Sequence, residues 1–256
     1  MIHFYKYQGT GNDFILIDNR SLNFNKQDTK LISRLCERKF GIGSDGLMLL
    51  ERHPDSDFRL HFFNPDGSQS FCGNGTRCAV ALAVKLGIAP EKGQVLATDG
   101  VHAYQYTPEQ VSISVHDVSS IQTIGKDYWL NTGSPHYIVF TDDVSKIDVV
   151  QEGRNVRYSE AWRANGTNVN FVQQTTEGIR IRTYERGVEN ETLSCGTGVT
   201  AAALASAAHF RWDKQLIEVQ TEGGVLYVKF ERKSEAFKHI WLCGPATPVF
   251  EGDAFI

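Results

Sequence analysis

The sequence predicts an α+β fold that is built twice: two pseudo-symmetric domains, each a mixed, mostly antiparallel sheet curled around a central buried helix. Three observations lead to this prediction: an internal repeat, short strand-like segments that outnumber the helices, and two alanine-rich helices that are apolar on nearly every face. Strands that do not alternate regularly with helices argue against a doubly wound parallel sheet. Helices that are apolar all round are typical of a protein interior.

The internal repeat appears when the chain is shifted by 123 residues (195 − 72). Cys72–Gly75 then falls on Cys195–Gly198, and both segments read Cys-Gly-x-Gly. Further matches keep the same register without a gap: Gly43 with Gly166, Phe14-Ile15 with Tyr137-Ile138, and Thr98 and Gly100 with Thr221 and Gly223. The repeat predicts two homologous domains of about 120 residues, a typical domain size. We place their boundary near Val118–Ile124, so that the first domain spans 1–118 and the second 119–243.

Each half contains four short segments of the kind that form strands, because they are rich in β-branched and aromatic residues. In the first half these segments are 14–17, 46–50, 58–63 and 111–115. In the second half they are 137–140, 169–172, 179–184 and 225–230. The two buried helices are predicted at 76–86 and 199–209.

The composition is that of a water-soluble globular protein, with 256 residues, 41% hydrophobic and 22% charged. A net charge of −4 without a basic run argues against a nucleic-acid or anionic-membrane surface, so we expect a small-molecule partner. No apolar run approaches the ~20 residues of a membrane helix, and polar residues interrupt the N-terminal segment, so we expect a cytoplasmic protein. Five cysteines are too few for a disulfide scaffold, which favours thiols that pack, bind ligands or act as nucleophiles.

The chemistry is predicted at the start of each buried helix, where Cys-Gly-x-Gly precedes the apolar run. The glycines permit a tight turn and a close approach of the backbone, and they place Cys72 and Cys195 at helix N-termini. There the helix dipole lowers a thiol pKa from about 8.5 toward neutrality. The same N–H groups can bind a substrate carboxylate. A single such cysteine would more simply be a packing residue, but two at equivalent positions favour catalysis.

Two thiols that face each other suit inversion of a stereocentre. One would remove the α-proton of an amino acid and the other would return a proton to the opposite face, with the roles exchanged in the reverse direction. A redox disulfide and a metal site are the competing interpretations. Neither Cys72 nor Cys195 belongs to Cys-x-x-Cys, and Cys72 with Cys78 lacks the partners and spacing of a zinc site, so we expect no metal.

Other polar residues are weaker candidates. Glu185 and Arg186 would ordinarily be a solvated charge pair, yet they precede Cys195 closely enough to line the same pocket, where Arg186 could bind a carboxylate. His136 follows Ser-Pro and is opposite Asp13 in the repeat. Three asparagines lie at strand ends and would individually be turn residues: Asn12, Asn64 and Asn168. The remaining cysteines, Cys36, Cys78 and Cys243, are expected to pack.

The chain resembles the diaminopimelate epimerase family over nearly its whole length. The motifs that carry the resemblance are Gly9–Phe14, Gly41–Gly46, Phe63–Ser68, Cys72–Arg77, Ser134–His136, Gly166–Asn168, Tyr184–Gly187, Cys195–Gly198 and the ending Gly244–Gly252. The resemblance implies the duplicated fold, a C-terminal strand at about 244–256 that joins the first domain, and an active site in the cleft between the domains. It also implies a homodimer that works without pyridoxal phosphate or another cofactor.

The same resemblance implies roles for individual residues. Cys72 and Cys195 would be the acid/base pair in the interconversion of LL- and meso-diaminopimelate, which serves lysine and peptidoglycan precursor synthesis. The reacting carboxylate would bind at Gly73, Asn74, Gly196 and Thr197. The rest of the substrate would be held by Asn12, Asn64, Asn168, Glu185 and Arg186, and His136 and Glu185 would tune the thiols.

Two positions depart from the family pattern, since many members carry Gln where this chain has Gly46 and Asn where it has Ser134. Contacts at the distal end of the substrate would then be fewer or mediated by water. The alternatives are another two-cysteine enzyme such as a proline racemase, a relative of the phenazine-biosynthesis isomerases, which lack the cysteine pair, and a non-catalytic amino-acid binding or redox-sensing protein.

Overall fold

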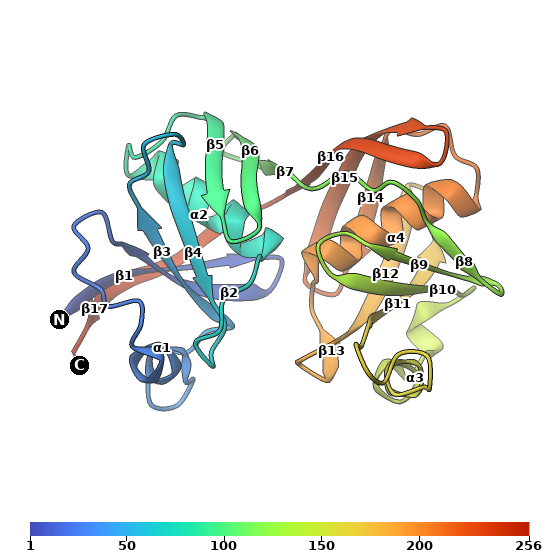
Figure 1. Ribbon diagram of the computed structural model, residues 1–256, viewed down its shortest axis with the longest axis horizontal. Coiled ribbons are helices and arrows are strands. Elements are labelled where there is room, and N and C mark those ends of the chain that lie inside the picture. Colours follow the sequence, from blue (N-terminus) through green and yellow to red (C-terminus); the bar gives the residue numbers. More distant parts are fainter. Residues whose placement is uncertain (256) are drawn as a thin grey trace. The chain divides into compact units, whose positions relative to one another are not determined.

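The computed structural model describes residues 1–255 of the chain, which divides into two compact units. Unit 1 is Met1–Ile113 together with the segment that begins at Gly244, and unit 2 is Ser114–Cys243. Each unit is dominated by a mixed sheet with few helices (Figure 1), which confirms the α+β fold class. No helix in residues 1–255 is long and apolar enough to cross a membrane.

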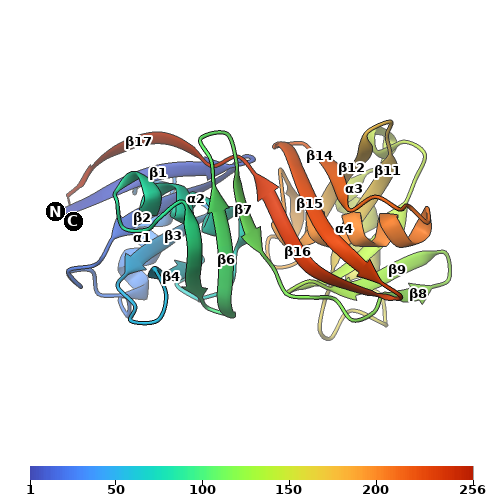
Figure 2. The ribbon, with the colours of Figure 1, turned by 90° about the horizontal axis from the view of Figure 1, so that it is seen from above.

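Unit 1 is an eight-stranded mixed sheet with the order β17-β1-β2-β3-β4-β5-β6-β7. Its elements are β1 (Ile2–Gly9), β2 (Asn12–Asp18), α1 (Thr29–Cys36), β3 (Gly46–Glu51), β4 (Phe58–Phe63), α2 (Gly73–Lys85), β5 (Lys92–Ala97), β6 (Gly100–Tyr106), β7 (Val111–Ser114) and β17 (Thr247–Ala254). The pairs β2–β3 and β4–β5 are parallel and the others antiparallel. The C-terminal strand β17 runs along β1 (Figure 2), with Ile2 opposite Ala254.

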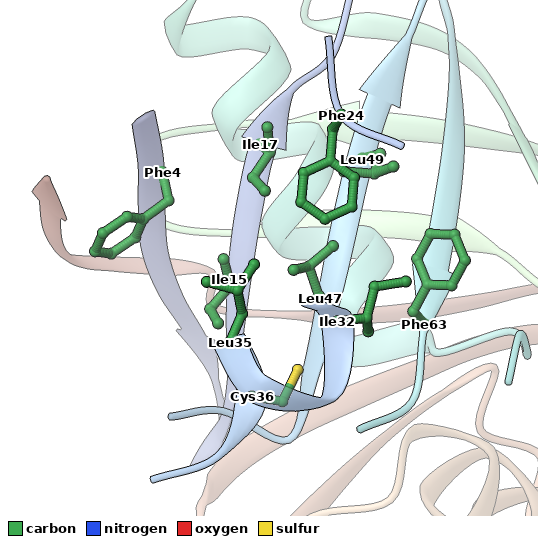
Figure 3. Packing of buried hydrophobic residues seen from close by; sticks show 10 residues of the cluster. All are labelled: Phe4, Ile15, Ile17, Phe24, Ile32, Leu35, Cys36, Leu47, Leu49 and Phe63. Carbon is green, nitrogen blue, oxygen red and sulfur yellow. The ribbon is translucent and has the colours of Figure 1, made fainter. Parts of the chain in front are cut away.

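Both faces of the central strands of unit 1 are covered. On one face, Ile32, Leu35 and Cys36 of α1 pack against alternate residues of β2 and β3, including Ile15 and Leu47 (Figure 3). On the other face the strands pack against α2, whose residues from Gly73 to Ala83 are buried. Burial on both faces explains why these strands are almost continuously apolar in sequence.

Unit 2 repeats this arrangement. Its elements are β8 (Gln122–Ile124), β9 (Asp127–Asn131), β10 (Pro135–Phe140), η1 (Val144–Lys146), α3 (Val149–Arg157), β11 (Asn168–Gln174), β12 (Gly178–Glu185), β13 (Asn190–Thr192), α4 (Gly196–His209), β14 (Leu216–Thr221), β15 (Gly224–Lys233) and β16 (Ala236–Gly244). The pairs β10–β11 and β12–β14 are parallel. They correspond under the shift of 123 residues to β2–β3 and β4–β5, and α4 corresponds to α2, so the repeat seen in the sequence is a repeat of topology.

Both buried helices begin three residues earlier than the sequence predicted, at Gly73 and Gly196, and the cysteines are the N-cap residues. The sequence interpretation assigned the glycines to a turn before the helix. Instead, Gly75 and Gly198 lie in the first helical turn, where an added side chain would be tight against Met48 at Gly75 and would displace Asn170 at Gly198. A Cβ atom at Gly75 would lie 3.0 Å from Met48 Sδ, and one at Gly198 would lie 2.5 Å from Asn170 Oδ1.

Candidate active site

The Cys72 thiol lies at the N-terminus of α2 and receives a helix-capping hydrogen bond. The backbone N–H of Gly75 donates to Cys72 Sγ at 3.4 Å. The thiol also donates to Asn12 Oδ1, at a sulfur–oxygen distance of 3.8 Å. The Asn12 carbonyl further accepts a hydrogen bond from Asn74 Nδ2 at 3.4 Å. Unit 1 therefore brings together three of the residues named from the sequence: Asn12, Cys72 and Asn74.

The amide of Asn12 is oriented by a charged network that the sequence analysis missed. Asn12 Nδ2 donates to Asp45 Oδ2 at 2.7 Å, so its carbonyl faces Cys72. Arg38 Nη2 contacts Asp45 Oδ1 at 2.7 Å and Asp13 Oδ1 at 2.6 Å. The ammonium of Lys6, a side chain only 7% exposed, pairs with Asp13 and donates to the Gly43 carbonyl. Although burial opposes ionisation, the bonds from Arg38 and Lys6 lower the pKa of Asp13.

Asn64 follows β4 and is held within its own loop. Its Nδ2 donates to Ser68 Oγ at 3.0 Å and to Ser70 Oγ at 3.3 Å. Ser70 precedes Cys72 by two residues, so the loop that contains Asn64 leads directly into the helix N-terminus. No described contact joins Asn64 to Asn12 within residues 1–255.

The Cys195 thiol lies at the N-terminus of α4 and is 8% exposed. Its Sγ is 3.5 Å from the hydroxyl oxygen of Thr197, two residues further on. His136 Nε2 lies 2.9 Å from that same hydroxyl oxygen. The Thr132 hydroxyl donates to the backbone carbonyl of Thr197 at 2.8 Å and fixes the first turn of α4. Unit 2 therefore brings His136, Cys195 and Thr197 together.

His136 is fully buried, which lowers its pKa to about 3 with a further contribution from the positive charge of Arg186. The imidazole is therefore neutral at physiological pH. Its Nδ1 lies 3.1 Å from Asn170 Nδ2. A neutral imidazole has one donor and one acceptor nitrogen, so each of its two contacts has a defined direction.

Asn168 and Arg186 lie close to this group. Asn168 Nδ2 donates to Ser134 Oγ and to the Pro135 carbonyl, both at 2.9 Å, and Asn168 Oδ1 accepts the backbone N–H of Arg186 at 2.9 Å. The Arg186 side chain is exposed and donates to the Asn165 carbonyl at 2.8 Å.

Glu185 is the last residue of β12, although the sequence interpretation placed it after the strand. It accepts the hydroxyl of Thr192 at 2.9 Å.

The two departures from the family pattern have local explanations. A Cβ atom at Gly46 would lie 2.5 Å from the Phe62 ring, so no side chain fits there unless Phe62 moves. The Ser134 hydroxyl accepts from Asn168 and so supports the amide of a predicted site residue.

Two of the remaining cysteines pack as predicted. Cys36 belongs to the apolar cluster of unit 1, and burial raises the pKa of Cys78 to about 12. Cys243 is also buried.

Six residues that support the predicted site residues were not predicted from the sequence: Lys6, Arg38 and Asp45 in unit 1, and Thr132, Asn170 and Thr183 in unit 2. Asn170 did have a sequence signal. It lies two residues after Asn168 and is flanked by Val169 and Phe171, so the two amides share one face of the sheet.

Solved structures with the same fold include a phenazine biosynthesis protein of the PhzF family from Bacillus anthracis, with a TM-score of 0.78 and 13% identity over 100% of this chain and 99% of that chain. A probable proline racemase from Agrobacterium radiobacter has a TM-score of 0.72 and 16% identity over 100% of this chain and 93% of that one. At these identities the likeness concerns the fold alone. The two groups weighed from the sequence as alternatives therefore do share the architecture.

Relatives found by sequence identify the family, whereas the solved structures show only the fold. The profile of the family described as "Diaminopimelate epimerase" matches residues 4–117 and 128–249. A diaminopimelate epimerase from Flavobacterium psychrophilum is 48% identical over 250 residues, which cover 96% of this chain and 98% of the relative. A diaminopimelate epimerase from Aquifex aeolicus is 39% identical, and the match covers 98% of this chain and 97% of the relative. These relations define an enzyme of the isomerase class. The chain belongs to the diaminopimelate epimerase family, which confirms the resemblance found in the sequence.

Proposed function

We propose that this enzyme interconverts LL- and meso-diaminopimelate by a two-base mechanism in which Cys72 and Cys195 flank the α-carbon. One cysteine, as a thiolate, takes the α-proton and becomes a thiol. The other, as a thiol, donates its proton to the opposite face of the carbanion and becomes a thiolate. The reverse reaction exchanges the two roles.

The observation that carries this proposal is the equivalence of the two cysteines. Each is the N-cap residue of the buried helix in a unit with the same strand pairing, and each precedes Gly-x-Gly. A reaction whose substrate and product are mirror-related at the reacting carbon suits a protein whose two halves present the same group. Packing alone would require neither the duplication of the thiol nor its position at a helix N-terminus.

The substrate carboxylate at the reacting carbon would accept hydrogen bonds from the backbone N–H groups of the helix N-termini, at Gly73-Asn74 and Gly196-Thr197. The rest of the substrate would be held by Asn12, Asn64, Asn168, Glu185 and Arg186. His136 and Glu185 would tune the thiols. The mechanism uses neither a cofactor nor a metal, since the thiols carry out both proton transfers.

We place the reaction in the cleft between the domains predicted at 1–118 with 244–256 and at 119–243. The enzyme would act as a cytoplasmic homodimer in lysine and peptidoglycan precursor synthesis. The names of the relatives support the substrate.

The decisive experiment is incubation with LL-diaminopimelate in deuterated water. Meso product with one solvent deuterium at the inverted carbon is expected, and the activity should survive prolonged chelation without pyridoxal phosphate. Proline and hydroxyproline serve as comparison substrates. Exchange with proline but not with diaminopimelate would replace this proposal with a proline racemase-like function, and a requirement for one restored metal would overturn the mechanism.

A second experiment tests whether the two cysteines share a site. Oxidation with diamide, which is reduced to the hydrazine as two thiols form a disulfide, should join Cys72 to Cys195 and stop turnover until a thiol reductant is added. Peptide mapping identifies the linked pair. Full activity after diamide treatment, with both residues still reduced, would show that they do not share a site.

A further inference from the structure

Three buried polar side chains form a row across neighbouring strands of unit 2. His136 lies on β10, Asn170 on β11 and Thr183 on β12, and their exposed fractions are 0%, 0% and 2%. Asn170 and Thr183 are directly opposite each other in the antiparallel pair β11–β12. Polar groups this deeply buried are stable only when hydrogen-bonded, so their directions of donation are constrained.

The amide of Asn170 has one possible orientation. One of its contacts is with the backbone carbonyl of Tyr137, 3.2 Å from Nδ2, and a carbonyl only accepts hydrogen bonds. The NH2 group must therefore be on that side. The amide oxygen then faces Thr183, whose hydroxyl donates to it at 2.9 Å.

This orientation determines the tautomer of His136. The second N–H of the Asn170 amide points at His136 Nδ1, 3.1 Å away, so Nδ1 must accept. The proton of the neutral ring is then on Nε2, which donates to Thr197 Oγ1 at 2.9 Å. Arg186 is the charged group that acts on this ring, and its positive charge also disfavours a second proton.

The Thr197 hydroxyl is the last member of this chain of hydrogen bonds before Cys195. Because its oxygen accepts from His136 Nε2, its own proton is directed elsewhere, and Cys195 Sγ lies 3.5 Å away. A hydroxyl that donates to sulfur stabilises the thiolate relative to the thiol.

We infer that Asn170 and Thr183 are positioning residues that fix the tautomer of His136 and so direct the hydroxyl proton of Thr197 at the Cys195 sulfur. The hydrogen bonds run in one direction, from Thr183 and the Asn170 amide through His136 and Thr197 to Cys195. The relevance of this series to catalysis rests on the proposed function, but the tautomer and the state of the thiol do not.

The packing at Gly198 fits this assignment. A Cβ atom there would lie 2.5 Å from Asn170 Oδ1 and 3.3 Å from His136 Cε1. The glycine of the second Cys-Gly-x-Gly motif thus allows the helix N-terminus to approach the row of polar groups closely.

The tautomer can be measured directly by nitrogen NMR of the full-length protein labelled at histidine, with the His136 signals assigned from a His136→Gln variant. Nδ1 of His136 should have the shift of an unprotonated ring nitrogen and Nε2 that of a protonated one. Asn170→Asp offers Nδ1 only acceptors, so it should move a proton onto Nδ1. Asn155→Asp, an exposed change of the same kind in unit 2, should leave both shifts in place. A proton on Nδ1 in the unaltered protein overturns the inference by itself.

The effect on the thiol is measured as the rate of alkylation of Cys195 by iodoacetamide, resolved by peptide mass spectrometry across pH. At a pH below the thiol pKa, a rise of one pH unit in that pKa lowers the thiolate fraction, and with it the alkylation rate, about tenfold. We expect about tenfold slowing at pH 7 in Thr197→Val and about threefold in the uncharged variant Asn170→Leu. Thr183→Val should slow it less, and Thr183→Ser, which keeps the hydroxyl, should restore the original rate.

A double-mutant cycle separates this series from general loosening of the fold. If Asn170 acts through Thr197, Asn170→Leu should have no further effect on alkylation once Thr197 is Val. Equal slowing in both backgrounds overturns the inference. Neither measurement needs diaminopimelate, so a protein with the expected tautomer and alkylation rates but without deuterium exchange would overturn the proposed function alone.

Discussion

The surroundings of the two cysteines differ although the helices that carry them are equivalent. In unit 1 the thiol of Cys72 faces the carbonyl of Asn12, which is oriented by the charged groups Asp45, Arg38, Asp13 and Lys6. In unit 2 the thiol of Cys195 faces the hydroxyl of Thr197, which is supported by neutral side chains.

In the proposed two-base mechanism, this difference would give a duplicated fold two unlike proton-transfer groups. The Asn12 carbonyl accepts from the Cys72 thiol and favours its protonated form, although the Gly75 N–H, 3.4 Å from the same sulfur, opposes this. In the arrangement inferred above, the Thr197 hydroxyl donates to Cys195 and favours the thiolate. A two-base reaction needs one group in each state when the substrate arrives. The contrast therefore predicts which cysteine holds the proton in the resting enzyme: Cys72.

Removing either thiol should have the largest effect. Cys72→Ala and Cys195→Ala should each lower epimerisation by at least about a thousandfold, because each direction needs one group to take a proton and another to give one. Exchange of the α-proton should survive for one isomer only, and for the opposite isomer in the two variants. Cys36→Ala, in the apolar cluster of unit 1, is the control for loss of a buried thiol. Substantial inversion by either active-site variant would contradict the two-base mechanism.

The second-largest effect is expected from the charged network of unit 1, and it concerns the stability of that unit. Asp13→Ala leaves the buried Lys6 without its carboxylate partner, which should destabilise unit 1 by about 3 kcal/mol. Asp18→Ala removes a more exposed pair with Arg20, whose side chain is 30% exposed, and should cost about 0.5 kcal/mol. Hydrogen exchange of β1 and β2 measures both. Equal effects would mean that the network adds nothing beyond an ordinary surface ion pair.

The stability of unit 2 should decrease in mild acid, because His136 is buried in its neutral form. The pKa of His136 is about 3 in the folded protein and about 6.5 in an unfolded chain. Above pH 6.5 neither state binds the proton; below it only the unfolded chain does, so stability falls as the pH falls toward 3. By pH 5 the loss should reach about 2 kcal/mol. Asp13, whose pKa is lowered, loses its contribution only below about pH 4, its range in an unfolded chain.

The contribution of His136 is the loss of stability between pH 6.5 and pH 5 in the protein minus the same loss in its His136→Gln variant. Hydrogen exchange in β10 and β11 measures both. The variant removes this group from the comparison. The difference is needed because burial also lowers the pKa of His61, in unit 1. An identical pH dependence in the two proteins would rule out a buried neutral His136.

The smallest effect is expected where the charged network meets the site. Asp45→Asn weakens the bond that orients Asn12 and should cost about 1 kcal/mol, or about a fivefold decrease in kcat. Asp55→Asn, at an exposed position of the same unit, is the matched control. An increase in KM without a change in kcat would mean that Asp45 acts on substrate binding and not on the thiol.

The sequence was sufficient for the features that local pattern encodes. The two alanine-rich helices, the fold class and eight of the seventeen strands in residues 1–255 followed from the sequence pattern and the repeat. Other strands, such as β1, β5, β6 and β14, were not predicted. The roles proposed for Cys72 and Cys195 rest on a motif that occurs twice. Asn170 and Thr183 could not be identified in this way, because their role depends on which strands become neighbours and on which groups share one face. Lys6 was missed for the same reason, since its partner Asp13 lies on the adjacent strand.

The pairing of β17 with β1 has a consequence for synthesis of the protein on the ribosome. Residues 114–243, which form unit 2, have all been made before β17 is translated, whereas unit 1 needs both the first strand and the last. Until the C-terminal residues emerge, β1 presents an unpaired edge to any other nascent strand. The unit translated first is thus completed only after unit 2 has been made, when β17 (Thr247–Ala254) pairs with β1 and takes its place as the edge strand.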